Sequence, residues 1–166
     1  MSEVRYEIPT DTAGRLAILP RPRGGDGLIS EVKNWHRSGI DTIVSLLTPD
    51  EIEEFDLANE RLHCDDNVMS FHAFPIPRHG IPGAGFSQLV RTIIDDLRLG
   101  RMVGIHGRQG VGRAGLVALA VLNELGRPIG DAIRIVTEAR GMPVPETPEQ
   151  RDWITLRSQQ PLPLPE

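Results

Sequence analysis

The sequence predicts a single α/β domain: a mostly parallel central sheet of about four to five strands with helices on both faces. Three observations support this. The chain has 166 residues, a length that suits one domain. Short apolar segments rich in β-branched residues alternate with longer segments of helical periodicity. The 17 glycines and 14 prolines fall largely between these segments, where they mark turns.

The first half of the chain supplies two strands and two helices. Residues 15–20 predict a short apolar strand that stops at Pro20. Residues 28–37 predict a helix, because apolar side chains recur there at helical spacing. Residues 41–47 predict a buried strand, since they are apolar and β-branched. The next residues, Thr48-Pro49-Asp50-Glu51, form a capping box with proline at the first helical position, so we expect a helix from there to about residue 63.

The second half continues the alternation. Residues 68–76 predict a strand, 77–83 a loop, 86–99 a helix and 102–105 a buried strand. A glycine-rich loop and three further helices follow, at residues 113–125, 129–140 and 146–158. We therefore expect an N-terminal extension (1–14), one domain (15–158) and a proline-rich tail (159–166).

Composition excludes several classes of protein. The formal net charge of −5 argues against a nucleic-acid binder that works by bulk charge. No apolar stretch is long enough to cross a membrane, and residues 1–12 lack the apolar region of a signal peptide. The single cysteine, Cys64, forms no intramolecular disulfide and is expected in the core. We therefore expect a cytoplasmic protein without a cofactor, and no metal site, since the histidines lack metal-ligand spacing.

The segment from His106 to Gly115 lies between a predicted strand and a predicted helix. Gly107, Gly110 and Gly112 allow backbone N–H groups to point into one concavity, and the helix N-terminus adds its positive end. Arg113 can donate two hydrogen bonds to one phosphate. The loop lacks the Gly-Lys-Ser/Thr of a Walker A motif and the glycine spacing of a dinucleotide fingerprint. It is expected to bind an oxyanion.

This segment resembles the signature of the cysteine-dependent protein tyrosine and dual-specificity phosphatases, His-Cys-x-x-Gly-x-x-Arg-Ser/Thr. His106, Gly110 and Arg113 match it. The resemblance extends from about residue 16 to 154 and implies the dual-specificity-phosphatase fold. It also implies a phosphate-binding loop made of Gly107, Arg108, Gln109, Gly110, Val111, Gly112 and Arg113. Residues 74–77 resemble the approach to the general-acid loop, and residues 145–150 resemble the segment whose glutamine, here Gln150, positions water.

Three positions depart from that family. Gly107 stands where the family has its nucleophilic cysteine, and glycine has no side chain with which to attack phosphorus. Arg78 stands where the general-acid aspartate is expected, and a guanidinium does not protonate a leaving group at neutral pH. Ala114 replaces the Ser or Thr that follows the arginine. The sequence thus resembles a pseudophosphatase, which we expect to be inactive by the cysteine mechanism.

The predicted function is binding of phosphate or of a phosphorylated protein without efficient hydrolysis. One alternative is an inactivated form of an active phosphatase, in which cysteine was changed to glycine. Another is a phosphate-independent interaction scaffold. A third is a residual hydrolase in which His79 or Gln150 assists a water molecule; His79 is otherwise a solvated loop residue. Arg108 either reads residues that flank a phosphate or is simply solvated.

Overall fold

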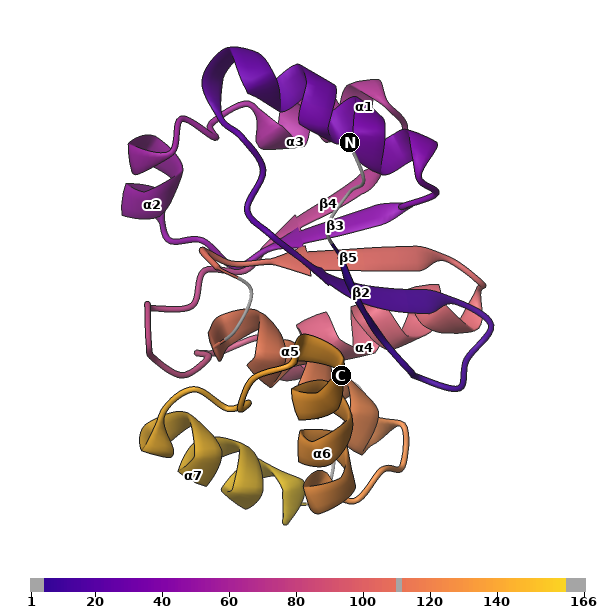
Figure 1. Ribbon diagram of the computed structural model, residues 1–166, viewed down its shortest axis with the longest axis vertical. Helices are drawn as coiled ribbons and strands as arrows, with labels where there is room; N and C mark the ends of the chain where they lie inside the picture. The colour runs from indigo at the N-terminus through magenta and orange to yellow at the C-terminus, as the bar shows by residue number, and fades with distance from the viewer. Residues whose placement is uncertain (1–4, 110–111, 161–166) are drawn as a thin grey trace.

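Five strands form one twisted sheet in the order β1-β2-β5-β3-β4 (Figure 1). The computed structural model describes residues 5–109 and 112–160. Strands β2, β5, β3 and β4 run parallel, and β1 pairs antiparallel with β2 at one edge. The strands span Tyr6–Ile8 (β1), Arg15–Leu19 (β2), Thr42–Ser45 (β3), Ser70–Ala73 (β4) and Met102–His106 (β5). The predicted α/β class and strand number are confirmed.

Helices cover both faces of the sheet (Figure 1). On one face lie α1 (Leu28–Arg37), α2 (Pro49–Glu54) and α3 (Glu60–Asp66), preceded by a short 3-10 turn, Gly25–Gly27. On the other lie α4 (Phe86–Arg98), α5 (Gly112–Glu124), α6 (Ile129–Arg140) and α7 (Pro148–Ser158). Helix α5 follows β5 directly and is buried along almost its whole length, which makes it the central helix of its layer. None of the helices in the described part of the chain is both long and apolar enough to cross a membrane.

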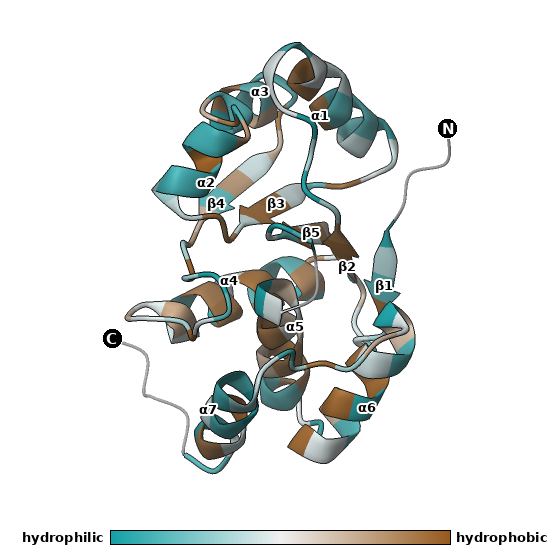
Figure 2. Cartoon of the chain, turned by 60° about the vertical axis from the view of Figure 1, so that its left-hand side comes forward, coloured by the Kyte–Doolittle hydropathy of each residue, from teal (hydrophilic) through white to brown (hydrophobic). Residues whose placement is uncertain are grey.

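Two apolar cores lie on opposite faces of the sheet because strand residues alternate between them. Ala17 and Leu19 of β2 pack toward α1 and α3, whereas Leu16 and Ile18 pack toward α4 and α5. Figure 2 shows the resulting pattern, with apolar strand and helix faces turned inward and polar faces outward. The strands between the two cores are therefore apolar on both sides, as expected for a parallel sheet.

Most predicted elements are found, and two differ. The single helix predicted from Thr48 to about residue 63 is instead α2 and α3, because the chain turns at Asp56, which adopts a left-handed backbone (φ 54°). The carbonyl of Asp56 accepts a hydrogen bond from the Gly25 amide at 3.0 Å, so a contact distant in sequence stabilises this turn. Strand β1 was not predicted at all, since the first residues are polar. Its residues 6–8 lie within the segment expected to be an extension.

Candidate phosphate-binding site

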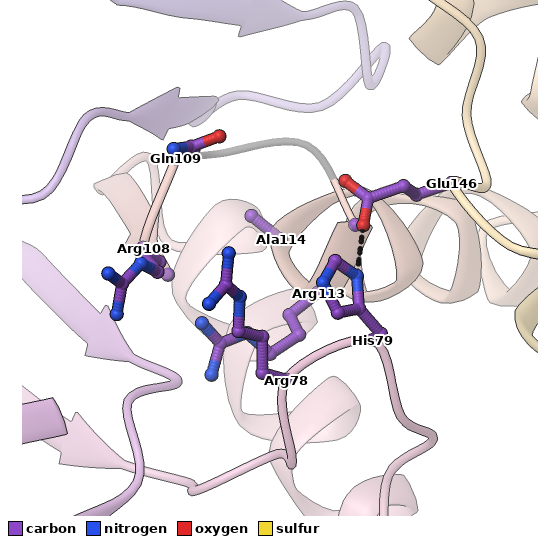
Figure 3. A pocket seen from close by; sticks show the side chains of 9 residues that line it. Arg78, His79, Arg108, Gln109, Arg113, Ala114 and Glu146 are labelled. Carbon is purple, nitrogen blue, oxygen red and sulfur yellow. Dashed lines mark hydrogen bonds and ion pairs between the residues drawn. The ribbon is translucent and has the colours of Figure 1, made fainter. Parts of the chain in front are cut away.

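A pocket opens at the carboxyl end of β5, where the chain passes into α5. The described residues that line it are Arg78, His79, Gly107, Arg108, Gln109, Gly112, Arg113, Ala114 and Glu146 (Figure 3). They come from the loop after β5, the first turn of α5, the loop after β4 and the segment before α7. The loop after β4 and the loop after β5 thus lie together at the carboxyl end of the strands. The predicted loop residues Gly110 and Val111 lie outside the described residues.

Arg113 forms the floor of the site, and its side chain is only 5% exposed. Its Nη1 donates to Glu51 Oε1 at 2.6 Å, and Nη2 donates to Glu51 Oε2 at 2.8 Å. Nη1 also donates to the Ile76 carbonyl at 3.0 Å. A guanidinium has five N–H groups, so three are used by these contacts. Among the described residues nothing accepts from Nε–H or from the second Nη2 hydrogen, which leaves one edge of the guanidinium for a ligand.

Glu51 holds that arginine in place and caps α2 at the same time. Its carboxylate accepts from the backbone N–H of Thr48 at 3.0 Å, completing the predicted capping box. The hydrogen bond from Arg113 lowers the pKa of Glu51 from its ordinary 4.5 to about 2, against the opposing effect of burial. Glu51 is therefore ionised throughout the physiological range. The sequence indicated its cap role and gave no sign of its pairing with Arg113.

Gly107 faces the remaining edge of Arg113. A Cβ added at Gly107 would lie 3.6 Å from Arg113 Nε, the nearest contact among the described residues apart from its two chain neighbours. A side chain at this position thus has room, and it would project over the guanidinium. In the present sequence the same space is open to a ligand oxygen, because glycine leaves it empty.

The loop that carries Arg78 and His79 is tied down on both sides. His79, in a left-handed backbone conformation (φ 60°), places Nδ1 2.6 Å from Glu146 Oε1 (Figure 3). Gln150 Nε2 donates to the Gly80 carbonyl at 3.0 Å. These contacts hold Arg78 at the pocket (Figure 3). Glu146 was not singled out in the sequence, where only its neighbour Gln150 drew attention.

Gln150 is fully buried and has a structural role in this arrangement. Its Oε1 accepts hydrogen bonds from the backbone N–H groups of Glu146 and Thr147, and its backbone N–H donates to Thr147 Oγ1. With Nε2 bound to Gly80, the amide connects α7 to the Arg78 loop. Gln150 is not among the described residues that line the pocket.

Arg108 is neither buried nor simply solvated. Its Nη2 lies 3.1 Å from Glu54 Oε2, and its guanidinium carbon lies 4.7 Å from the centre of the Phe55 ring. The guanidinium carbon of Arg21 lies 3.6 Å from the same ring centre, so Phe55 contacts two guanidinium groups. Arg108 therefore lines the pocket with a partly fixed orientation.

His106, immediately before the loop, is fully buried and pairs with a carboxylate. Its Nε2 lies 2.6 Å from Glu60 Oε2 of α3, and its ring stacks on Trp35 with centroids 6.0 Å apart. This contact joins β5 to α3 directly behind Gly107. Glu60, like Glu51, is a buried carboxylate that the sequence did not distinguish from surface acids.

Cys64 is buried in α3, and burial raises the pKa of its thiol to about 12. It is not among the described pocket residues, so it does not replace the missing nucleophile. Within the described ranges, no group of three or more His, Cys, Asp or Glu side chains is arranged to hold a metal ion.

Comparison with solved structures identifies proteins that share this α/β fold. No protein-family model and no curated protein matches the chain, but many solved structures do. One is a kinase associated phosphatase whose catalytic cysteine is replaced by serine (TM-score 0.85, 19% identity, 93% of both chains covered). Another is Tk-PTP in its active form (TM-score 0.77, 25% identity, 93% of this chain and 97% of the other). A third is a human tyrosine phosphatase-like serine/threonine/tyrosine-interacting protein (TM-score 0.64, 18% identity, 86% and 92%). The chain therefore has the fold of the cysteine-dependent tyrosine and dual-specificity phosphatases.

Proposed function

We propose that this chain binds phosphate, or a phosphorylated protein, in the pocket at Gly107 and does not hydrolyse it efficiently. Two departures from the pattern of the phosphatase family support the absence of efficient hydrolysis. Gly107 offers no thiolate to attack phosphorus, so the two-step covalent path is closed. Arg78 offers no proton to a leaving group, because a guanidinium stays charged in proteins.

The observation that carries the proposal is the edge of Arg113, Nε–H and one Nη2–H, that no described residue occupies. The Glu51 carboxylate holds the other end of the guanidinium through two hydrogen bonds. That contact orients the arginine before a ligand arrives, so binding need not order the side chain. The free Nε–H and Nη2–H match two oxygens of one phosphate group.

The balance of charge around the pocket also favours an anion. Three of its basic side chains have a carboxylate neighbour: Arg113 with Glu51, Arg108 with Glu54 and His79 with Glu146. Arg78 has no such partner among the described residues. It supplies positive charge that no described carboxylate neutralises, and the tied loop keeps it close to the site.

Calorimetric titration of inorganic phosphate and of phosphopeptides tests this function. Arg113→Ala would leave the Glu51 carboxylate buried and unpaired, which endangers folding. We therefore choose Arg113→Gln combined with Glu51→Gln, alongside Arg78→Ala. Arg98→Ala is the matched control, since Arg98 is exposed at the end of α4, at the opposite edge of the sheet.

We expect the double variant to weaken phosphate binding by about tenfold to a hundredfold, the loss that a pair of charge-assisted hydrogen bonds implies. Arg78→Ala should weaken it by about tenfold, and Arg98→Ala should leave it unchanged. Phosphate that neither binds nor stabilises the original chain would refute the proposal. Equal binding by the folded double variant would show that phosphate binds elsewhere.

A further inference from the structure

The described walls of the pocket are polar. Among the nine described residues that line it, six have charged or polar side chains, two are glycines, and Ala114 supplies the one apolar side chain. No phenylalanine, tyrosine or tryptophan belongs to this set, and the one ring in it, the imidazole of His79, is polar and pairs with Glu146. A phosphate is thus well matched, whereas an aromatic ring attached to it would find little apolar surface.

Aromatic rings on elements that neighbour the pocket already make contacts of their own. Phe55 lies against the guanidinium groups of Arg21 and Arg108. Phe86 packs against Phe74 and Trp153, with ring centroids 6.0 and 5.2 Å apart. None of these rings is free to stack on the phenyl group of a phosphotyrosine without giving up a contact that it already makes.

A carboxylate lies in this anion-binding pocket, which calls for an explanation. Glu146 directs Oε1 to His79, and no described residue donates to its Oε2. An acceptor beside a phosphate dianion opposes binding unless the ligand also brings a hydrogen-bond donor. In the view of Figure 3, the arginines lie on one side of the pocket and the His79–Glu146 pair on the other. A ligand between them would present phosphate to one side and a donor to the other.

We propose that the pocket selects phosphate monoesters of aliphatic alcohols that carry an N–H or O–H donor close to the phosphate, over aryl phosphates such as phosphotyrosine. The inference rests on the proposed function and narrows its ligand. In a phosphoserine or phosphothreonine peptide, only Cβ and Cα separate the ester oxygen from the peptide N–H. A phosphorylated polyol places hydroxyl groups at a similar distance. Phosphotyrosine inserts a whole ring before its first donor.

Glu146 is the specificity-determining residue in this proposal. Its carboxylate penalises a bare phosphate and favours a ligand whose donor reaches Oε2. Selectivity of this kind combines an attraction to one ligand with a repulsion of the other. Removal of the carboxylate should therefore act in opposite directions on the two kinds of ligand, which loss of a purely structural contact would not do.

Titration of five ligands into the full chain tests the proposal. Two are peptides of one sequence, carrying either phosphoserine or phosphotyrosine. The others are glycerol phosphate, phenyl phosphate and inorganic phosphate. We expect each aliphatic ester to bind at least about tenfold more tightly than its aryl counterpart, the scale of one charge-assisted hydrogen bond. The peptide and glycerol phosphate arms distinguish a protein ligand from a small molecule.

Because the hydrogen bond from Gln150 to Gly80 still holds the Arg78 loop, Glu146→Ala should reduce that preference to near unity while inorganic phosphate binds as tightly as before or more tightly. Glu149→Ala is the matched control, because Glu149 is exposed three residues further along and lies outside the described pocket lining. It should retain the preference. Equal or tighter binding of the aryl esters overturns this inference and leaves phosphate binding intact. If inorganic phosphate and all four esters fail to bind, the proposed function falls with it.

Discussion

Acid should destabilise this fold through one buried ion pair, Glu51 with Arg113. The Glu51 side chain is 8% exposed, and its pKa falls from 4.5 to about 2 in the folded chain. At about 1.4 kcal/mol per pKa unit, this difference corresponds to about 3 kcal/mol of folding free energy. Because the folded pKa is the lower one, the contribution is complete above pH 4.5. It is lost as the pH falls toward about 2.

Urea unfolding, followed by circular dichroism at a series of pH values, measures this contribution. Other carboxylates also titrate in this range, so the informative quantity is the difference between the original chain and Glu51→Gln. That difference should shrink by about 3 kcal/mol between about pH 5 and about pH 2, which moves the urea midpoint by about 1–2 M. Glu53→Gln, an exposed change on the same helix, should show no such trend. If Glu51→Gln and the original chain lose stability in parallel, the pairing with Arg113 does not have the strength that we assign to it.

Substitutions at two further glycines, each with a comparison variant, test the site and its support. Gly107→Cys should fold, because the nearest described contact of the new Cβ beyond its chain neighbours is at 3.6 Å. This variant should hydrolyse aryl phosphates weakly. The double variant Gly107→Cys with Arg78→Asp should have a hydrolysis rate higher by about 10²–10⁴, the usual contribution of a general acid. Full activity from Gly107→Cys alone would instead favour an inactivated phosphatase. Gly115→Ala should lower the thermal midpoint, since its Cβ would come within 2.5 Å of Val144 beside the pocket. A Cβ added at Gly130 has no described atom within 4 Å, so Gly130→Ala should stabilise α6 by about 0.5–1 kcal/mol. Equal changes of the thermal midpoint in Gly115→Ala and Gly130→Ala would contradict the close packing of Gly115 against Val144.

Local pattern predicts those parts of the fold that local interactions decide. Helices α1 and α6 begin and end at the predicted residues, and α4 ends one residue early, because apolar periodicity and flanking glycines specify their limits. The helix predicted from Thr48 to about residue 63 fails for the opposite reason. Its break at Asp56 depends on a hydrogen bond from Gly25, thirty-one residues earlier, which no window of helical periodicity contains. Strand β1 fails similarly, since it is short and its pairing with β2 decides its conformation.

In the candidate site, too, residues close together in sequence could be predicted and residues paired across long separations could not. The loop from Gly107 to Arg113 is contiguous, so its glycines and arginine could be identified in sequence as an oxyanion-binding loop. The carboxylates around it could not. Glu51 is 62 residues from Arg113, and its capping box already gave it a local role. Glu146 is 67 residues from His79 and lies among other acids near the end of the chain.

One physical rule limits where the carboxylate partner of Arg113 can lie. A buried guanidinium needs a carboxylate partner, because an unpaired charge in the interior costs several kcal/mol. Once Arg113 is placed at a helix start under a parallel sheet, the partner must come from a neighbouring strand end. Glu51 begins α2 just after β3, the strand beside β5. The same carboxylate that starts α2 therefore orients the arginine. Changes that weaken the helix cap should also weaken phosphate binding. Thr48→Ala tests this link, because it should lower both the free energy of unfolding and the affinity for phosphate.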